Sequence, residues 1–397
     1  MTQSAVQPHT DELLAVRQAA LRLSAYCQSH DWAGYDPYDA LNSEILQRLP
    51  ILQFRTARLM LTQLLKRSPF NLRPLLLVPR SQNPKGIALF ISALLRLARL
   101  QLMPLDIPRS LVSSLFELRS PGTAQWCWGY PFPWQSRAAL FPRWLPNVIC
   151  TTFAGNALLD AYEELADPEC LRIAVSAADF LLDTLYYEEP GSVACFSYTP
   201  LARSKVHNAN LLGAAFLCRV GKDSCDERYF APALKAARFS VAHQDPDGSW
   251  YYGESDNPPQ RWKDNFHTGF NLTALLTISR TAGTDEFEAA TRRGFQFFRE
   301  HFFEPDGTPR YFHDRTYPVD IHSAAQSIIT LVSFKDLDPE NVKLAGSVCR
   351  WTLENLYAAQ GFFFFQKQRL YTNKVPYMRW SQAWMLLALS ILLEERS

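Results

Sequence analysis

One pattern of hydrophobic and polar positions occurs five times along the chain. Each time, a helix-like segment ends in a glycine turn, a short aromatic run follows, and a polar cluster opens the next apolar segment. The five glycines are Gly122, Gly191, Gly248, Gly307 and Gly361, at intervals of 54 to 69 residues. A recurring interval of this length predicts a repeated supersecondary unit whose copies pack against one another.

The helical segments of this pattern belong to two alternating sets. One set is apolar on most sides and rich in small residues, and it comprises 157–165, 211–218, 272–279, 323–332 and 383–393. The other set has one charged face, and it comprises 171–186, 229–243, 286–301 and 342–357. A helix that is apolar all round is buried, whereas one with a charged face lies at the surface. We therefore predict an all-α fold, an (α/α)6 toroid or barrel, with aromatic β-hairpin-like loops at one mouth.

The first 120 residues depart from this repeat. Helical periodicity covers 11–27, 56–66, 85–100 and 109–118. Two polar or proline-rich segments, 34–43 and 68–86, form either a lid near the mouth or a strap that joins the first and last repeats. We expect a single toroid domain over 1–397, in which 1–120 is an irregular part with lid-like loops and 121–397 holds the regular helical hairpins.

Composition and charge narrow the class of protein. The 40 basic and 39 acidic residues give a net charge of +1, which argues against a nucleic-acid partner. The N-terminus does not resemble a secretory signal, and the apolar run 385–393 is too short to cross a bilayer. Eight scattered cysteines without a CxxC spacing indicate reduced thiols. We expect a cytoplasmic protein with no integral membrane segment, and a peripheral membrane contact through aromatic loops stays an alternative. The oligomeric state is not predicted.

The polar clusters open the apolar helices, so a toroid would place all five around one mouth. They are NVICTTF from Asn147, SKVHNAN from Ser204, KDNFHTGF from Lys263, PVDIHSAAQ from Pro318 and PYMRWSQAW from Pro376. Helix N-termini carry partial positive charge and suit an anionic or hydroxyl-rich ligand. Capping alone would explain the Asn, Asp, Ser and Thr residues, but it does not require the His, Arg and Trp side chains.

Two of these clusters combine a carboxylate with a histidine. Asp264 and His267 form one pair, and Asp320 and His322 form the other, one unit later. A nearby carboxylate sets the tautomer of an imidazole and raises its pKa, so we predict these four residues as catalytic acid–base groups. The alternative is that they cap helices and form hydrogen bonds across the barrel. With His207 in the same phase, three histidines could bind a metal, but an expected separation of ~10 Å leads us to predict neither metal nor cofactor.

Charged, aromatic and amide side chains near these pairs are predicted to bind the substrate. Arginine can hold a carboxylate with two hydrogen bonds, and aromatic faces suit the apolar faces of sugar rings. The predicted substrate-binding residues are Asp36, Arg73, Lys205, His207, Tyr252, Glu254, Arg261, Trp262, Lys263, Arg379, Trp380 and Gln382.

Several stretches resemble known proteins. DGSWYYGE followed by FHTGFNLTALL resembles the repeat of α/α-toroid, six-hairpin-like proteins, which include glucuronyl C5-epimerases, N-acylglucosamine 2-epimerases and squalene-cyclase-like toroids. RWSQAW is similar to the W-x-R-G-Q-A-W stretch of unsaturated glucuronyl hydrolases, without its glycine. GYDPYDALNS, SPFNLRP and NPKGIALF resemble a bacterial group of surface-polysaccharide biosynthesis clusters, over 34–90 and 247–393.

Together, the pattern and the resemblance predict a carbohydrate-active protein of bacterial surface-polysaccharide biosynthesis, such as capsule, exopolysaccharide or O-antigen. We expect it to be a hydrolase, lyase or epimerase that performs acid–base chemistry on a sugar or oligosaccharide, for example one that carries a uronate. One alternative is a non-catalytic glycan-binding or scaffold protein of a polysaccharide assembly system. Another is a terpene-cyclase-like enzyme, which would need a deep apolar cavity.

Overall fold

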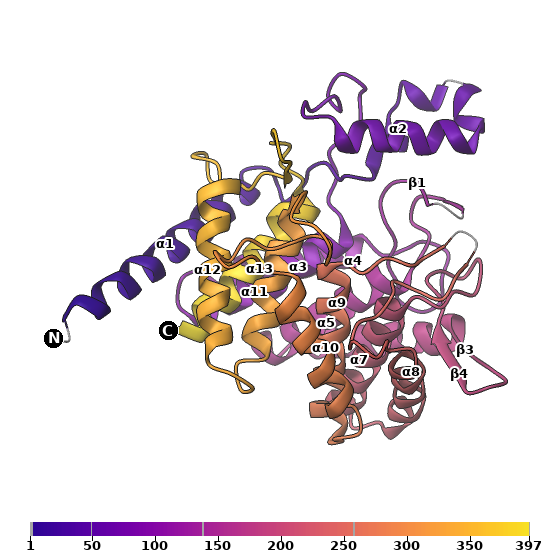
Figure 1. Ribbon diagram of the computed structural model, residues 1–397. Coiled ribbons are helices and arrows are strands. Elements are labelled where there is room, and N and C mark those ends of the chain that lie inside the picture. The colour runs from indigo at the N-terminus through magenta and orange to yellow at the C-terminus, as the bar shows by residue number, and fades with distance from the viewer. Residues whose placement is uncertain (1–2, 49, 137–138, 257–258, 397) are drawn as a thin grey trace. The chain divides into compact units, whose positions relative to one another are not determined.

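The computed structural model describes residues 3–48, 50–136, 139–256 and 259–396, and side chains from residue 11 onward except that of Ile51 (Figure 1). These residues are mostly helical, with a few short strands. They form two compact units. Unit 1 comprises Met1–Pro108, Phe303–Tyr311 and Arg315–Ser397, and unit 2 comprises Arg109–Phe302 and Phe312–Asp314. The single domain over the whole chain stays a prediction.

Unit 2 contains a row of buried helices, each covered by a second helix. Its helices are α4 (Asp106–Glu117, which begins in unit 1), α5 (Val148–Leu165), α6 (Pro168–Phe180), η4 (Leu181–Leu185), α7 (His207–Ser224), η5 (Glu227–Tyr229), α8 (Phe230–Ala242), α9 (Asn265–Ala282) and α10 (Glu288–His301). Helix α7 packs between α5 and α9, while α6, α8 and α10 pack on α5, α7 and α9 respectively. Thirteen of the eighteen residues of α7 are buried, against six of fourteen in α10. This difference confirms the predicted alternation of buried and surface helices.

Unit 1 has the same arrangement at the other end of the repeat. Its helices are α1 (Gln3–Gln28), η1 (Asp39–Asn42), η2 (Leu46–Arg48), η3 (Pro50–Gln53), α2 (Arg55–Arg67), α3 (Pro84–Arg99), α11 (Ile321–Ser333), α12 (Glu340–Leu356), η6 (Met378–Ala383) and α13 (Trp384–Arg396). Helix α13 packs between α11 and α3, with α12 on α11 and α1 on α13 (Figure 1). The expected helices of the first 120 residues are all present, within a few residues of their predicted bounds except at the start of α1.

The strands are short and lie in or beside the aromatic runs. They are β1 (Trp134–Gln135), β2 (Leu140–Phe141), β3 (Tyr186–Glu189), β4 (Val193–Phe196), β5 (Val319–Asp320), β6 (Gln366–Lys367) and β7 (Thr372–Asn373). β1 pairs with β2, β3 with β4, and β6 lies between β5 and β7, all antiparallel. The best-formed hairpin is β3–β4, which turns at Gly191 and pairs Tyr186 with Phe196. Hairpin-like aromatic segments therefore precede the buried helices, as predicted.

All five repeat glycines adopt positive φ angles, between +75° and +90°. Only glycine takes this conformation without strain, which explains its recurrence at the turns. Gly248 has a second constraint, because a Cβ atom there would lie 2.4 Å from the carbonyl oxygen of Arg293, whereas one at Gly191 would meet nothing within 4 Å.

We therefore expect unequal costs for the same substitution at two turns. Gly191→Ala should lower the free energy of unfolding by about 1–2 kcal/mol through backbone strain alone. Gly248→Ala should cost a further ~1–3 kcal/mol, since the added methyl group meets a backbone carbonyl that cannot move aside easily. Urea denaturation of the two variants measures the difference, and equal losses would show that the close approach at Gly248 does not matter.

Among the described residues, no helix is both long enough and apolar enough to cross a membrane.

Candidate functional site

The predicted polar clusters do lie at the first turns of buried helices. The side chains of Asn147, Asp264 and Asp320 cap α5, α9 and α11 by accepting backbone N–H groups. Ser204 does not cap α7, because its hydroxyl accepts the backbone N–H of Tyr198 instead. Capping therefore accounts for part of the polar character, and what remains to be explained is the histidines and their partners.

His267 and Asp264 form a close dyad in unit 2. His267 Nδ1 lies 2.7 Å from Asp264 Oδ2, and the other carboxylate oxygen, Oδ1, accepts the backbone N–H of His267 at 3.0 Å. Trp262 Nε1 also donates to Asp264 Oδ2, at 3.0 Å. The Asp264 side chain is 1% exposed and the His267 side chain 22% exposed. The carboxylate is thus fixed by three donors, and it orients an imidazole that solvent can reach.

Aromatic rings border this dyad. The rings of Tyr252 and Trp262 are stacked, with centroids 4.5 Å apart and an interplanar angle of 14°. The Tyr252 ring also contacts His267, at 4.7 Å between centroids. The ring centroids of Phe266 and Phe270 lie 4.2 Å and 6.3 Å from that of the imidazole. Aromatic rings therefore cover part of the imidazole, and the remainder is open to solvent.

A second histidine of unit 2 also pairs with a carboxylate. His207 Nε2 lies 2.8 Å from Glu254 Oε1, and its Nδ1 lies 3.3 Å from the hydroxyl of Ser240. The hydrogen bond from His207 holds the pKa of Glu254 below its ordinary value. His207 is fully buried, whereas the Glu254 side chain is 32% exposed, so the carboxylate is the accessible member of this pair. The peptide N–H of His207 donates to Tyr252 O, which places the two dyads on neighbouring chain segments.

The three predicted substrate-binding cations of unit 2 are paired within the protein. Lys263 Nζ lies 2.8 Å from Asp245 and 3.2 Å from Asp247, and its side chain is only 11% exposed. Lys205 pairs with Glu189 at 3.1 Å. Arg261 pairs with Asp256 at 3.0 Å, and these two side chains are 65% and 81% exposed. An ion pair as exposed as the last one is weak, so Arg261 is the cation whose partner a ligand could most readily replace.

Asp320 of unit 1 is a buried carboxyl group with three hydrogen bonds. Its Oδ1 accepts from Trp380 Nε1 at 2.9 Å and from the backbone N–H of His322 at 2.9 Å. Its Oδ2 accepts from Gln366 Nε2 at 3.0 Å. Burial raises the pKa of Asp320 to about 6, although the Trp380 hydrogen bond and the charge of Lys66 act to lower it.

This raised pKa makes a prediction for the pH dependence of stability. An unfolded aspartate has a pKa of about 3.9, so the folded state holds the proton more tightly. The stabilisation by Asp320 is therefore complete below about pH 4 and is lost as the pH rises to about 6. Between pH 4 and 7, the free energy of unfolding of Asp320→Asn should gain about 2–3 kcal/mol relative to the wild type. Denaturant titrations at several pH values test this, and parallel profiles would contradict it.

His322 lies between two tryptophans. Its ring is 4.7 Å from that of Trp380 at 84°, and 4.4 Å from that of Trp384 at 27°. Asp320 contacts the peptide N–H of His322, so the structure does not reproduce the carboxylate–imidazole contact of the Asp264–His267 dyad. Both residues are 1% exposed. Their part in catalysis stays a prediction, with less support from the geometry than that of His267.

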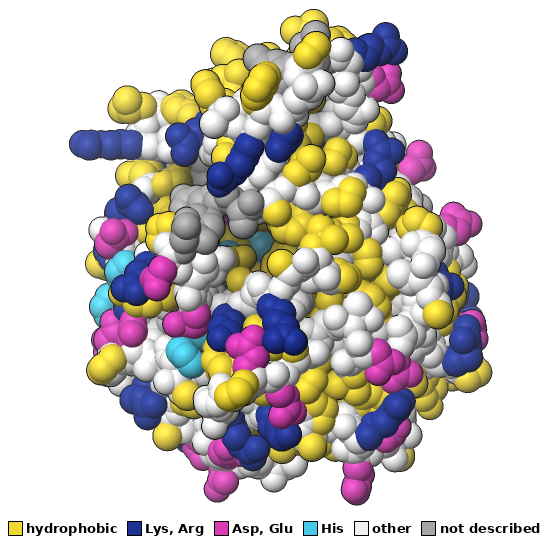
Figure 2. All heavy atoms as spheres, turned by 90° about the vertical axis from the view of Figure 1, so that its right-hand side faces the viewer, with side chains coloured by type: hydrophobic (Ala, Val, Ile, Leu, Met, Phe, Trp, Pro, Cys, Tyr) yellow, Lys and Arg dark blue, Asp and Glu magenta, His cyan; other side chains and the backbone are white. Residues whose placement is uncertain are grey.

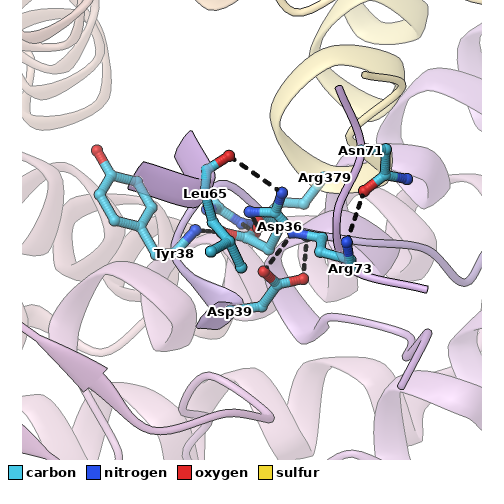
Figure 3. A network of polar contacts seen from close by, with 7 residues as sticks. All are labelled: Asp36, Tyr38, Asp39, Leu65, Asn71, Arg73 and Arg379. Carbon is cyan, nitrogen blue, oxygen red and sulfur yellow. Dashed lines mark hydrogen bonds and ion pairs between the residues drawn. The ribbon is translucent and has the colours of Figure 1, made fainter. Parts of the chain in front are cut away.

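Arg379 and Arg73 hold buried carboxylates of the N-terminal segment (Figure 3). Arg379 donates two hydrogen bonds to Asp36, Nε to Oδ2 at 2.5 Å and Nη2 to Oδ1 at 2.8 Å. Arg73 Nε donates to Asp39 Oδ1 at 2.6 Å, and Nη2 donates to the carbonyl of Asp36. All four residues are at most 4% exposed. Since the guanidinium groups are engaged with internal carboxylates, these contacts favour the strap over the lid. They also favour structural rather than substrate-binding roles for Asp36, Arg73 and Arg379.

The last predicted binding residue, Gln382, contacts the backbone of its own unit. Its side-chain amide accepts from the N–H of Phe363 and donates to the carbonyl of Phe363, each at 2.8 Å.

Lys66 is a residue that the sequence did not single out. It donates to Tyr38 Oη at 2.8 Å and lies 5.7 Å from the Trp380 ring centroid. A lysine in the last turn of an amphipathic helix is common, so no local signal marked it.

The described residues contain no group of three or more His, Cys, Asp or Glu side chains that could hold a metal ion. The eight cysteines are free thiols, and all but Cys225 are buried.

No protein-family model and no curated protein sequence matches the chain, but solved structures do. A cellobiose 2-epimerase from Spirochaeta thermophila is 12% identical, with a TM-score of 0.61 over 79% of this chain and 86% of that chain. An alpha-mannanase from Bacteroides thetaiotaomicron is 13% identical, with a TM-score of 0.62 over 80% and 87%. A D-mannose isomerase is 12% identical, with a TM-score of 0.59 over 78% and 87%. The protein has the (α/α)6-toroid fold.

This similarity confirms the predicted fold class and the distant resemblance to α/α-toroid proteins. At 12–13% identity the similarity concerns the fold alone, and the substrates of these enzymes cannot be transferred to this chain. A function for this chain must therefore be argued from its own side chains.

Proposed function

We propose that this protein is a carbohydrate-active enzyme that transfers protons to and from a sugar through His267. The observation that carries the proposal is the Asp264–His267 dyad, with its 2.7 Å contact between carboxylate and imidazole. Asp264 accepts a hydrogen bond from Nδ1–H, so Nε2 is the nitrogen that can take up or release a proton. The stacked Tyr252 and Trp262 rings beside the imidazole provide an aromatic surface of the kind on which sugar rings pack.

Within this class, we infer that epimerisation or isomerisation fits the dyads better than hydrolysis. Glycoside hydrolysis generally needs two carboxyl groups that act directly on the glycosidic bond. In unit 2, Asp264 and Glu254 are each engaged with a histidine, at 2.7 Å and 2.8 Å. An oriented imidazole can instead abstract a proton from the carbon next to a sugar carbonyl and return it. Two of the similar structures, the cellobiose 2-epimerase and the D-mannose isomerase, have names that fit this reaction class.

Hydrolysis is the second candidate, supported by Asp320. A carboxyl group whose pKa is raised to about 6 holds its proton to a higher pH than an ordinary aspartate, as a general acid must. Its 1% exposure means that a substrate could reach it only if neighbouring side chains moved. An alpha-mannanase with the same fold gives this alternative a precedent.

We keep bacterial surface-polysaccharide biosynthesis as the biological setting, on the resemblance of 34–90 and 247–393. A substrate with a uronate could interact with Arg261, whose exposed pair with Asp256 is weak. We also propose that the substrate is a sugar or oligosaccharide and that the protein acts in the cytoplasm. Asp36, Arg73 and Arg379 are proposed to position the chain rather than to touch the sugar.

The proposal can be tested by incubating the protein in D2O with a panel of reducing monosaccharides, disaccharides and uronates, followed by NMR. We expect a new sugar that carries deuterium at the carbon of proton exchange. Release of a new reducing end without deuterium at carbon would indicate the hydrolase, and an unsaturated product would indicate a lyase. Saturation-transfer signals without any product would overturn the enzyme in favour of a glycan-binding protein. If neither a product nor binding is detected, the proposal of a sugar substrate is overturned altogether.

A further inference from the structure

The chain has a long stretch of one charge sign. Between Ile45 and Leu105 there are ten lysine and arginine residues and no aspartate or glutamate, although the whole chain has 40 basic and 39 acidic residues. Arg48, Arg55, Arg67 and Arg80 of this stretch are exposed. This segregation of charge differs from the lower part of the face in Figure 2, where basic and acidic side chains are interspersed.

The same part of the chain exposes large hydrophobic side chains. The described residues include sixteen such side chains, and nine of them lie on η2, α2 and the segments beside them, or on the β6–β7 hairpin of the same unit. They are Ile45, Phe54, Met60, Leu64, Phe70, Leu75, Leu77, Leu370 and Tyr371. Met60, Phe70 and Leu75 are 73–75% exposed, and Leu370 is 93% exposed. We call these nine residues, with the four exposed arginines above, the α2 surface.

The α2 surface is built on a helix whose other face is fixed. Thr62 and Leu65 of α2 are buried, whereas Met60, Leu64 and Arg67 follow the i, i+4, i+7 spacing on its exposed face. The β6–β7 hairpin is tied to the end of α2, because Tyr371 Oη and Asn373 Nδ2 donate to the carbonyls of residues 66–68. Hydrophobic and basic side chains lie together at the top of Figure 2, where α2 lies in Figure 1. Met60 and Leu64 are therefore held on a packed helix, and the other seven hydrophobic residues lie on the turns and the hairpin beside it.

We propose that the α2 surface binds peripherally to an anionic lipid bilayer. Large apolar patches on a soluble unit mark interaction sites. Glu44 is an exposed acidic neighbour of this surface, next to Ile45 and hydrogen-bonded to Leu77. Bulky apolar side chains interleaved with four arginines still complement a layer of acyl chains below anionic headgroups. A second copy of this chain is a less complementary occupant, since it would bring the same basic residues into opposition. The proposal does not depend on the sugar chemistry proposed above.

The experiment is co-sedimentation of the full chain with vesicles of phosphatidylcholine alone or mixed with phosphatidylglycerol. We expect binding to the mixed vesicles that is at least about tenfold tighter than to neutral ones and that weakens at high salt, because counter-ions screen the headgroups. Equal affinity for both kinds of vesicle, or no binding to either, would overturn the proposal.

Two sets of variants locate the contact. Phe70→Ser with Leu370→Ser should lower vesicle binding at least about tenfold, and Arg55→Glu with Arg67→Glu should abolish the preference for anionic vesicles. Leu140→Ser with Leu201→Ser is the matched control, since both leucines are exposed in unit 2 and should not affect binding. Thermal unfolding checks that all variants remain folded. Light scattering that shows a dimer lost in the Phe70/Leu370 variant, without vesicle binding by the wild type, would assign the surface to a second copy and overturn the proposal.

Discussion

Replacement of Arg379 by methionine is expected to lower the free energy of unfolding by about 3–5 kcal/mol. Arg379 is 4% exposed and donates two hydrogen bonds to Asp36, which is also 4% exposed. Methionine would occupy much of the same apolar space but would leave the carboxylate buried without its counter-charge. The loss should appear in urea denaturation as a lower midpoint with an unchanged dependence on urea concentration.

The control for this prediction is an ion pair of the same residue types at the surface. Arg261 and Asp256 are 65% and 81% exposed, so Arg261→Met should cost about 0–1 kcal/mol. The double variant Asp36→Leu/Arg379→Met should recover part of the stability lost in Arg379→Met, because it no longer buries a lone charge. If Arg379→Met costs no more than Arg261→Met, solvent reaches Asp36 and the pair does not fix the strap.

The partner of Arg379 could not be predicted from the repeat. The stretch RWSQAW lies in the same phase as the other polar clusters, so Arg379 was expected to bind substrate. In the structure it binds Asp36, a residue 343 positions earlier that lies outside the repeat. The position of a residue within the repeat places its side chain at the start of a helix. It does not determine which distant segment of the chain packs against that helix start. The same reason explains why the contact of Asp320 with Trp380, 60 residues later, was not foreseen.

The Asp264–His267 pair was predictable because its geometry is local. Asp264 caps α9, and a residue three positions into the helix has its N–H and its side chain next to the cap. The helices and turns were predictable for a similar reason, since hydrophobic period and glycine position are short-range signals. Asp320–His322 shows the limit of this argument, because a spacing of two residues instead of three brings the peptide N–H, and not the ring, to the carboxylate.

Replacement of Asp264 by asparagine should reduce turnover of the sugar substrate by roughly 10²–10⁴-fold. It should also lower the free energy of unfolding by about 1–3 kcal/mol, because the N–H of Trp262 loses its acceptor Oδ2. Asparagine caps helices as well as aspartate does, and its amide oxygen can still accept a hydrogen bond. Its NH2 group, however, would donate to His267 Nδ1 and force the proton of the ring onto Nε2. The imidazole would then present a donor where the proposed reaction needs a base.

Two further variants separate this effect from other causes. Asp167→Asn makes the same exchange at the cap of α6, where the side chain accepts only a backbone N–H, and it should leave turnover unchanged. His267→Ala should be about as inactive as Asp264→Asn, and the double variant should lose no more than either single one, because residues that act as a unit are not additive. Full activity of Asp264→Asn would mean that the tautomer of His267 is irrelevant. Additive losses would mean that the two side chains act separately, in which case the dyad holds the helix start and the proton-transfer group lies elsewhere.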